Sequence, residues 1–305
     1  AMGARMLRSF LEQPLVRKAE MEERLDAVEA FCRDPLSRDE IREYLNPVYD
    51  MERLLGKVSY KTANPRDLIA FRSSMEMLPP IKTVLRNLPG AANQRIEEEI
   101  DGLEDLCGLI RSSIEDEPPV SIREGGMIRE GYNEDVDNLR RAKTEGKTWL
   151  AELENTERER TGIKNLKIKY NRVFGYYFEV TKSYLDLVPA DYSRKQTLTN
   201  AERFTMPRLK ELEDTILNAE DKLCSLEYDL FCEIRDRIAS QVERIQTTAK
   251  AIARLDVFCS LSLTAEQNHY VRPALNEKGL INIRDGRHPV VEKMIDHDMF
   301  IPNDT

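Results

Sequence analysis

The chain of 305 residues is long enough to bury a hydrophobic core without disulfide bonds, and its length suggests roughly two domains. Charged residues make up 33% of it and aromatic residues 7%, which favours long helices with wide solvated faces over a compact α/β enzyme. The net charge of −9 argues against uniform binding to nucleic acid or to an anionic membrane, but it is compatible with a local basic patch, because salt screens charges beyond about 8–10 Å.

Residues 4–131 predict a core made of successive helices, because apolar residues recur there at helical spacing. Proline and glycine predict the breaks, which we place at Pro14, Asp34–Pro35, Pro79–Pro80 and Pro89–Gly90. The stretch 93–116 is amphipathic throughout and predicts one helix, and the stretch 117–131 predicts a loop or a short hairpin.

Two local motifs predict where helices of this core begin. Ser37 and Glu40 have the spacing of a capping box. Asn64 is placed to cap a later helix, with Pro65 at its first helical position.

Two long helical arms follow, and they flank a different kind of segment. Residues 132–162 predict an ascending arm that contains almost no helix breaker except Gly146. Residues 207–272 predict a descending arm and a return to the core, beginning at Pro207. The descending arm carries a heptad seam of Leu209, Leu212, Ile216, Ala219, Leu223, Leu226 and Leu230. We expect the seam to pack on the ascending arm of the same chain; an intermolecular coiled coil is the alternative.

Residues 163–206, between the arms, predict a small antiparallel β insert. Leu166, Ile168 and Tyr170 alternate with lysines, and in the returning run a single face carries Phe174, Tyr176, Phe178 and Val180. We expect those aromatics to form the insert's own core. A second hairpin is predicted to turn at Asn200–Ala201; a short helix capped by Thr199 is the alternative. The predicted fold is therefore mainly α, with a helical core and long antiparallel helices carrying a β insert.

The insert is also the basic part of an acidic chain. Between Lys164 and Lys210, ten basic and four acidic residues give a net charge of +6, against −15 for the remainder. Such a contrast favours a phosphate partner and predicts backbone contact to duplex DNA; a solvated basic face on a structural insert, or one that binds an acidic protein, is the alternative. The candidate DNA-binding residues are Asn171, Arg172, Lys182, Arg194, Lys195, Thr197, Thr199, Asn200 and Arg203.

The sequence offers no convincing catalytic, cofactor-binding or metal-binding motif. Gly146-Lys147-Thr148 resembles the end of a P-loop, but Arg141 stands where the first glycine is required, and the stretch lies inside a helical pattern. The histidines lack metal-ligand spacing, and chance is the preferred interpretation of 296–298, Asp-His-Asp. We therefore expect no enzymatic activity from this chain.

The last segment and the cysteines complete the sequence-based expectations. Leu280, Ile281 and Ile283, then Val290 and Val291, predict short strands around a turn at 286. We take 273–305 as the beginning of another domain. The five cysteines form no CxxC pair, which predicts a reducing compartment, and neither a membrane span nor a signal peptide is recognisable, so we expect a cytoplasmic protein.

Three stretches together resemble one protein family. GYYFEVTK at 175–182, TLTNAERFT at 197–205 and GRHPVVE at 286–292 are similar to the MutS family of bacterial DNA mismatch-repair proteins. The resemblance extends over about 3–305. It identifies 163–206 with the family's DNA clamp, the two arms with its lever helices, and 273–305 with the start of its ATPase domain. Phe10-Leu11-Glu12 matches the family's mismatch-reading Phe-x-Glu motif by letter only.

The resemblance implies a longer parent protein. Such a parent would be a DNA-dependent ATPase that uses ATP and magnesium, acts as a homodimer on mismatched DNA, and recruits a MutL-type partner. Its levers would transmit the state of the ATPase to the clamp. The present chain would keep only the clamp's non-specific grip on duplex DNA, without cofactors, and would be largely monomeric. A MutS homologue that serves recombination is the alternative.

Overall fold

The computed structural model describes residues 2–295 and 300–305, so the Asp-His-Asp group at 296–298 lies outside the described residues. The chain divides into two compact units. The first unit comprises Ala1–Asn46, Pro79–Ile100 and Thr248–Thr305, and the second comprises Pro47–Leu78 and Asp101–Thr247. Both are dominated by helices, and the second also holds a four-stranded antiparallel sheet, so the predicted fold class is confirmed.

The first unit is a packed group of helices. Helix α2 contacts both α3 and α7, and side chains from several helices are fully buried, among them Phe31, Ile41, Ile81 and Leu85. The helices of this unit are α1 (Met2–Glu12), α2 (Lys18–Arg33), α3 (Pro35–Leu45), most of α6 (Leu78–Asn87), α7 (Ala91–Glu99), most of α11 (Val242–Gln267) and α12 (Val291–Met294).

Two predictions for the core were wrong: the helix start at Ser37 and the single helix over 93–116. Helix α3 is capped by Asp34, whose carboxylate accepts from the backbone N–H of Ser37 at 3.1 Å, so the helix begins three residues before the predicted capping box. The stretch 93–116 forms two helices, α7 and α8 (Glu104–Ser113). Asp101 accepts from the N–H of Leu103 at 2.9 Å, a local turn that competes with helix.

The strands predicted near the end of the chain were also wrong. Among the described residues there, only an isolated bridge joins Gly286 to Asn303, and Val291 begins the short helix α12. Leu280 and Ile281 are 67% and 78% exposed. Because two short strands are marginal in water without a third partner or a packed face, the apolar pattern alone does not produce a sheet.

The second unit is built around two long helices. Its shorter helices are α4 (Met51–Ser59), α5 (Pro65–Met75) and α8, and its long ones are α9 (Glu134–Thr161) and α10 (Pro207–Ala239). The predicted start of α5 is confirmed: Asn64 and Asp67 form a capping box, with Pro65 at the first position. No helix in the described part of the chain is long and apolar enough to cross a membrane.

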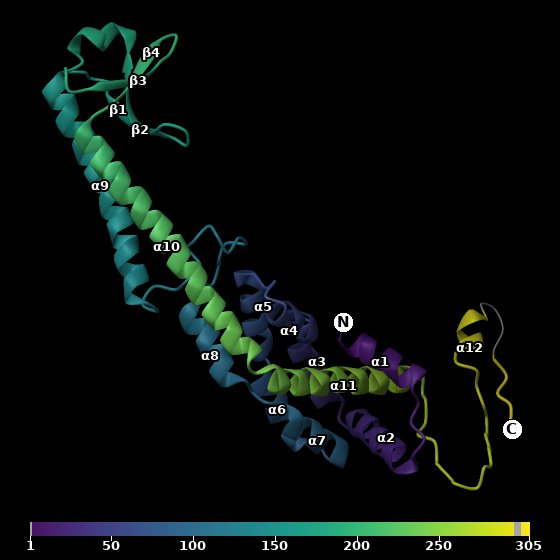
Figure 1. Ribbon diagram of the computed structural model, residues 1–305. Coiled ribbons are helices and arrows are strands. Elements are labelled where there is room, and N and C mark those ends of the chain that lie inside the picture. Colours follow the sequence, from purple (N-terminus) through teal and green to yellow (C-terminus); the bar gives the residue numbers. More distant parts are fainter. Residues whose placement is uncertain (1, 296–299) are drawn as a thin grey trace. The chain divides into compact units, whose positions relative to one another are not determined.

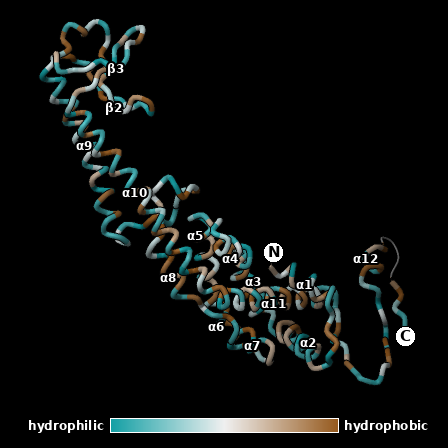
Figure 2. The backbone as a smooth tube through the Cα atoms, viewed as in Figure 1, coloured by the Kyte–Doolittle hydropathy of each residue, from teal (hydrophilic) through white to brown (hydrophobic). Residues whose placement is uncertain are grey.

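Helices α9 and α10, hereafter the levers, lie side by side and antiparallel (Figure 1). Hydrophilic and hydrophobic residues alternate along both (Figure 2). They approach closely at Gly146, where an added Cβ would lie 2.5 Å from Cγ1 of Ile216. In the heptad seam as far as Leu223, Leu212 is partly buried and the other members are buried, but beyond it the inner positions are taken by Glu227, Phe231, Ile234 and Ile238. The shift follows from the drift of a 3.6-residue helix against a 3.5-residue repeat.

A buried carboxylate fixes a loop to the levers. Glu227 of α10 is fully buried and accepts from the N–H groups of Gly126 and Met127 and from the guanidinium of Arg140 on α9. Gly125 and Gly126 both have positive φ, so consecutive N–H groups can point at one anion. The loop predicted over 117–131 is thus held at the side of the levers.

The sheet joins the far ends of the levers. Its strands are β1 (Lys167–Asn171), β2 (Gly175–Thr181), β3 (Ser193–Thr197) and β4 (Ala201–Thr205), in the order β1-β2-β4-β3 and all antiparallel. A 3-10 helix, η1 (Lys182–Leu187), follows β2. The predicted second hairpin is confirmed, and a bulge at Lys195 interrupts the pairing of β3 with β4.

Candidate nucleic-acid interface

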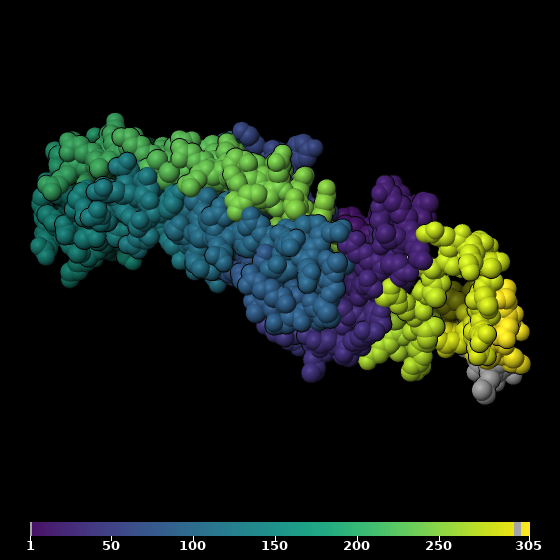
Figure 3. Space-filling view, turned by 90° about the horizontal axis from the view of Figure 1, so that it is seen from below, coloured from purple at the N-terminus to yellow at the C-terminus, as the bar shows by residue number. Residues whose placement is uncertain are grey.

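Residues 163–206, which we call the clamp, share one hydrophobic cluster with the levers. Phe178 pairs with Phe204 across β2 and β4, and the rings of Phe178 and Tyr192 stack at 5.1 Å. Phe178 and, partly buried, Tyr176 therefore belong to a core as predicted, whereas Tyr170, predicted for the packed face of β1, is 51% exposed. The space-filling view shows the clamp and the ends of both levers as one continuous surface (Figure 3). The buried members of the cluster are Leu150, Leu153, Ile163, Leu166, Phe178, Val180, Tyr192, Phe204, Leu209 and Ile216.

A carboxylate from each lever holds the backbone of the first hairpin. Glu154 of α9 accepts from the N–H of Ile168 at 2.8 Å, and Glu213 of α10 accepts from the N–H of Tyr176 at 3.2 Å. Gly175 has φ +70°, and a Cβ there would lie 2.0 Å from the Glu213 carboxylate, so the position requires glycine. The hairpin is thus fastened to both levers at once.

A second anchor lies at the end of α9. Glu157 is 4% exposed and accepts from the hydroxyl of Tyr192 at 2.8 Å and from Arg160, which also contacts Asp191 at 3.0 Å. Burial, followed by the hydrogen bond to Glu157, raises the pKa of Tyr192 above its ordinary value. The hydroxyl thus stays protonated and remains a donor at neutral pH.

The face of the sheet opposite the core is charged but partly self-neutralised. Glu179 lies 2.8 Å from the ammonium of Lys169 and 3.9 Å from Nε of Arg203, with its pairing partner Lys167 also on this face. The Arg203 guanidinium lies over the ring of Tyr177 at 4.5 Å. Only 17% of the Arg203 side chain is exposed, so the centre of this face presents little free positive charge.

Four of the predicted DNA-binding residues already have partners inside the clamp. Arg203 donates to Gln196 at 2.7 Å, and Lys195 donates to the carbonyl of Phe174 at 2.7 Å. Arg194 donates to Glu202 at 3.4 Å. The side chain of Asn171 accepts from the N–H of Val173 at 2.8 Å.

The other predicted residues are exposed and lie at two ends of the clamp. Arg172 is in the turn between β1 and β2. Lys182 begins η1, and its N–H donates to the carbonyl of Asn200 at 3.2 Å, which brings it to the β3–β4 hairpin with Thr197 and Thr199. Within the described part of the chain, the side chains of Arg172 and Lys182 form no ion pair.

Sequence reasoning passed over other members of this surface. Lys164 and Lys167 are exposed and form no ion pair with any described residue, although both contributed to the predicted basic charge. Their positions, Lys164 just before β1 and Lys167 at its start, could have indicated that both belong to the exposed basic surface. Glu179 meets Lys169 across the β1–β2 hairpin, but its approach to Arg203 depends on the pairing of β2 with β4, which are not consecutive strands.

No group of three or more histidine, cysteine or acidic side chains in the described ranges is arranged to hold a metal ion. The arrangement on the clamp is suited to another kind of chemistry. Flexible cations, hydroxyl groups and a carboxamide gather on exposed turns, and such groups bind phosphate oxygens without reading bases.

Comparison with known proteins gives one consistent result. A family model described as MutS domain III matches residues 1–262. The chain is 63% identical to the DNA mismatch repair protein MutS of Lachnoclostridium phytofermentans, over 100% of this chain and 33% of that protein. It is 53% identical to the MutS of Ruminiclostridium cellulolyticum and 50% identical to that of Acetivibrio thermocellus, in each case over 100% of this chain and 35% of the relative. The chain thus spans about a third of the length of these curated relatives.

Proposed function

The chain belongs to the MutS family of DNA mismatch-repair proteins, and on that premise we propose that its clamp binds the sugar–phosphate backbone of duplex DNA without reading the base sequence. The observation that carries the proposal is the charge of the clamp. Exposed cations without an ion pair among the described residues gather there, in a chain whose net charge is −9; they are Lys164, Lys167, Arg172 and Lys182.

The side chains proposed to contact phosphate first are the exposed ones. Arg172 lies at one end of the clamp, and Lys182, Thr197, Thr199 and Asn200 lie at the other. Two separated contact points on a backbone fix orientation better than one. Arg194, Lys195 and Arg203 belong to the proposal as secondary contacts, because each must first release an internal partner.

We further propose that the levers transmit conformational change to the clamp in the longer protein. The support is the pair of carboxylates, Glu154 and Glu213, that joins the backbone of one hairpin to both levers. Relative sliding of the levers would pull on β1 and β2 at different points.

The roles of the whole protein remain part of the proposal. These roles are recognition of mismatched DNA, ATP hydrolysis with magnesium, homodimer formation and recruitment of a MutL-type partner, in the cytoplasm. For this chain alone we propose non-specific DNA binding, no catalysis and a largely monomeric state.

A binding titration tests the proposal. Fluorescence anisotropy of a labelled duplex, measured at two salt concentrations, compares the wild type with Arg172→Gln and Lys182→Gln. Each lost phosphate contact lowers the salt slope by about one and weakens matched and mismatched duplexes alike. Lys222→Gln is the matched control, because Lys222 is exposed on α10 away from the clamp.

Two results would oppose the proposal. If both clamp variants retain wild-type affinity and salt slope, these residues do not contact DNA. If an acidic protein binds the clamp and excess unlabelled duplex fails to displace it, the insert serves protein interaction instead.

A further inference from the structure

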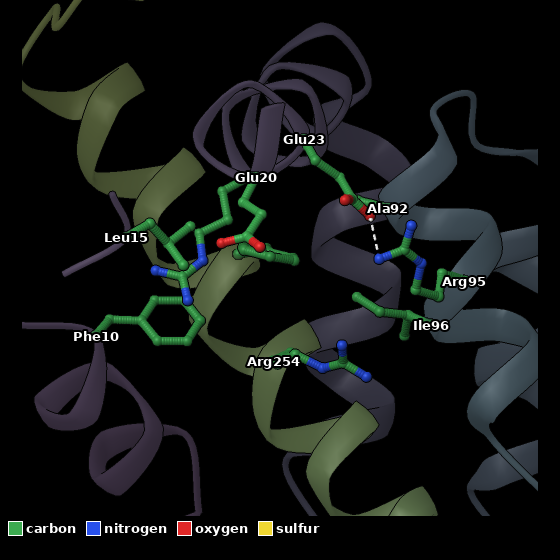
Figure 4. A pocket seen from close by; sticks show the side chains of 10 residues that line it. Phe10, Leu15, Glu20, Glu23, Ala92, Arg95, Ile96 and Arg254 are labelled. Atoms are coloured by element: carbon green, nitrogen blue, oxygen red, sulfur yellow. Dashed lines mark ion pairs between the residues drawn. The ribbon is translucent and has the colours of Figure 1, made fainter. Parts of the chain in front are cut away.

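A cavity of about 230 Å³ lies within the first unit, far in sequence from the clamp. It is lined by residues of α1, the α1–α2 connection, α2, α7 and α11. Its apolar wall includes the rings of Phe10 and Phe258, whose centroids are 6.4 Å apart. Figure 4 shows Phe10 at one side of the cavity and the ion pair of Glu23 with Arg95 at the other.

Three guanidinium groups reach this cavity from three helices. Arg95 pairs with Glu23 at 3.0 Å, and Arg254 pairs with Glu99. The remaining acidic residue of the lining, Glu20, has Arg17 at 3.4 Å.

Arg24 is the guanidinium of this lining that forms no ion pair with a described residue. Within the described residues, no carboxylate oxygen lies within 4.0 Å of its guanidinium nitrogens. It lies over the ring of Phe10 instead, with Cζ 3.5 Å from the centroid. An aromatic ring stabilises a cation less than a carboxylate does and leaves the guanidinium N–H groups free to donate. The charges around the cavity therefore sum to one excess positive charge.

The surroundings of the cavity disfavour the charged forms of Arg24 and Arg254. Burial, followed by the nearby charges of Arg95 and Arg24, lowers the pKa of Arg254, against the opposing effect of Glu23. Burial likewise lowers the pKa of Arg24, against the opposing effect of Glu20. A negative group placed between Arg24 and Arg254 would offset both effects.

We propose that this cavity is a binding site for a small anionic ligand, a carboxylate or a phosphate monoester on an apolar body. The anionic group is held by Arg24 and Arg254, and the apolar body lies against Phe10 and Phe258. The volume is below the ~300–1,000 Å³ of pockets that enclose drug-sized ligands, which restricts the body to a single ring or a short chain.

Calorimetric titration with four probes tests the chemistry. Benzoate and phenyl phosphate carry both features, benzamide lacks the charge, and inorganic phosphate lacks the apolar body. We expect saturable binding of at least one of the first two, and binding of benzamide and phosphate that is weaker by roughly tenfold, since a charged hydrogen bond and a buried ring each contribute about that factor.

Two variants and a control tie the binding to the cavity. Arg24→Gln removes the unpaired charge, and Ala92→Met fills the cavity from its wall without altering charge. Both are expected to weaken binding by roughly tenfold or more. Arg33→Gln, on the exposed side of α2, should bind as the wild type does. Circular dichroism checks that each variant is folded.

The proposal is overturned by any of three results. These are no saturable binding by benzoate or phenyl phosphate, equal binding of benzamide, or unchanged binding by the folded Ala92→Met variant.

Discussion

The close approach of the levers at Gly146 provides a sharp stability prediction. Replacing a solvent-facing helical glycine by alanine stabilises a helix by about 0.5–1 kcal/mol. At Gly146, however, the new Cβ would lie 2.5 Å from Cγ1 and 3.1 Å from Cδ1 of Ile216, which is 3% exposed. Overpacking of this kind costs about 1–3 kcal/mol. We expect Gly146→Ala to lower the free energy of unfolding by about 1 kcal/mol.

The chain supplies a control for the helix propensity. Gly108, in α8 of the same unit, has no atom within 4 Å of where its Cβ would be. Gly108→Ala should therefore be stabilising by about 0.5–1 kcal/mol. The two substitutions are chemically identical, so the difference in sign isolates the contact with Ile216.

The assay follows the levers directly. The single tryptophan, Trp149, lies on α9 one turn from Gly146, so its fluorescence during urea unfolding reports on the lever pair. In an Ile216→Ala background, Gly146→Ala should become stabilising, because the clashing atoms are gone. The reasoning is refuted if Gly146→Ala raises the urea midpoint as much as Gly108→Ala does.

Three further substitutions test the clamp, the loop anchor and the root of α11. Glu179→Gln removes a negative charge from the exposed face of the sheet; we expect tighter duplex binding and a salt slope steeper by up to about one in the anisotropy titration, and an unchanged affinity would show that DNA does not approach this face. Glu227→Gln leaves the charge of Arg140 uncompensated at a buried site, so we expect the free energy of unfolding, measured in urea, to fall by about 2–3 kcal/mol. A decrease below about 0.5 kcal/mol would contradict the role of Glu227 as an anchor. Hydrogen bonds from Arg244 hold the pKa of Asp101 and of Asp105 below their usual values, so their stabilisation is present above about pH 4 and is lost as the pH falls through the lower folded values. Because these groups are well exposed, Arg244→Gln should cost less than about 1 kcal/mol at pH 7, and its deficit should shrink below about pH 4; a pH-independent deficit would exclude this linkage.

Sequence reasoning succeeded where structure is decided locally. Asn64 and Pro65 predicted a helix start because the cap forms among four consecutive residues. It failed where two local signals competed. Asp34 is also a good cap, and because its side chain accepts from the backbone N–H of Ser37, the helix begins ahead of the motif predicted at Ser37. The break after α7 was hidden for a similar reason, since apolar spacing continues across Asp101.

The candidate interface was likewise predicted only in part. Charge and alternation were enough to locate the basic β insert and its aromatic core. They could not distinguish a free cation such as Lys182 from an internally satisfied one such as Arg203. That distinction depends on contacts in the folded sheet. Gln196, which accepts from Arg203, lies opposite it across β3 and β4, and Glu179 lies opposite it across β2 and β4, which are not consecutive strands.

The length of α10 has a mechanical consequence. Its 33 residues span about 50 Å at 1.5 Å per residue, with the clamp at one end. A rigid rod of that length amplifies rotation, so a tilt of about 5° at its root displaces the far end by roughly 4 Å, which exceeds the length of a hydrogen bond. Contacts made by the tips of the clamp can therefore be formed or broken with no rearrangement inside the sheet. The stiffness of the paired helices determines how much of the rotation at the root becomes displacement of the clamp.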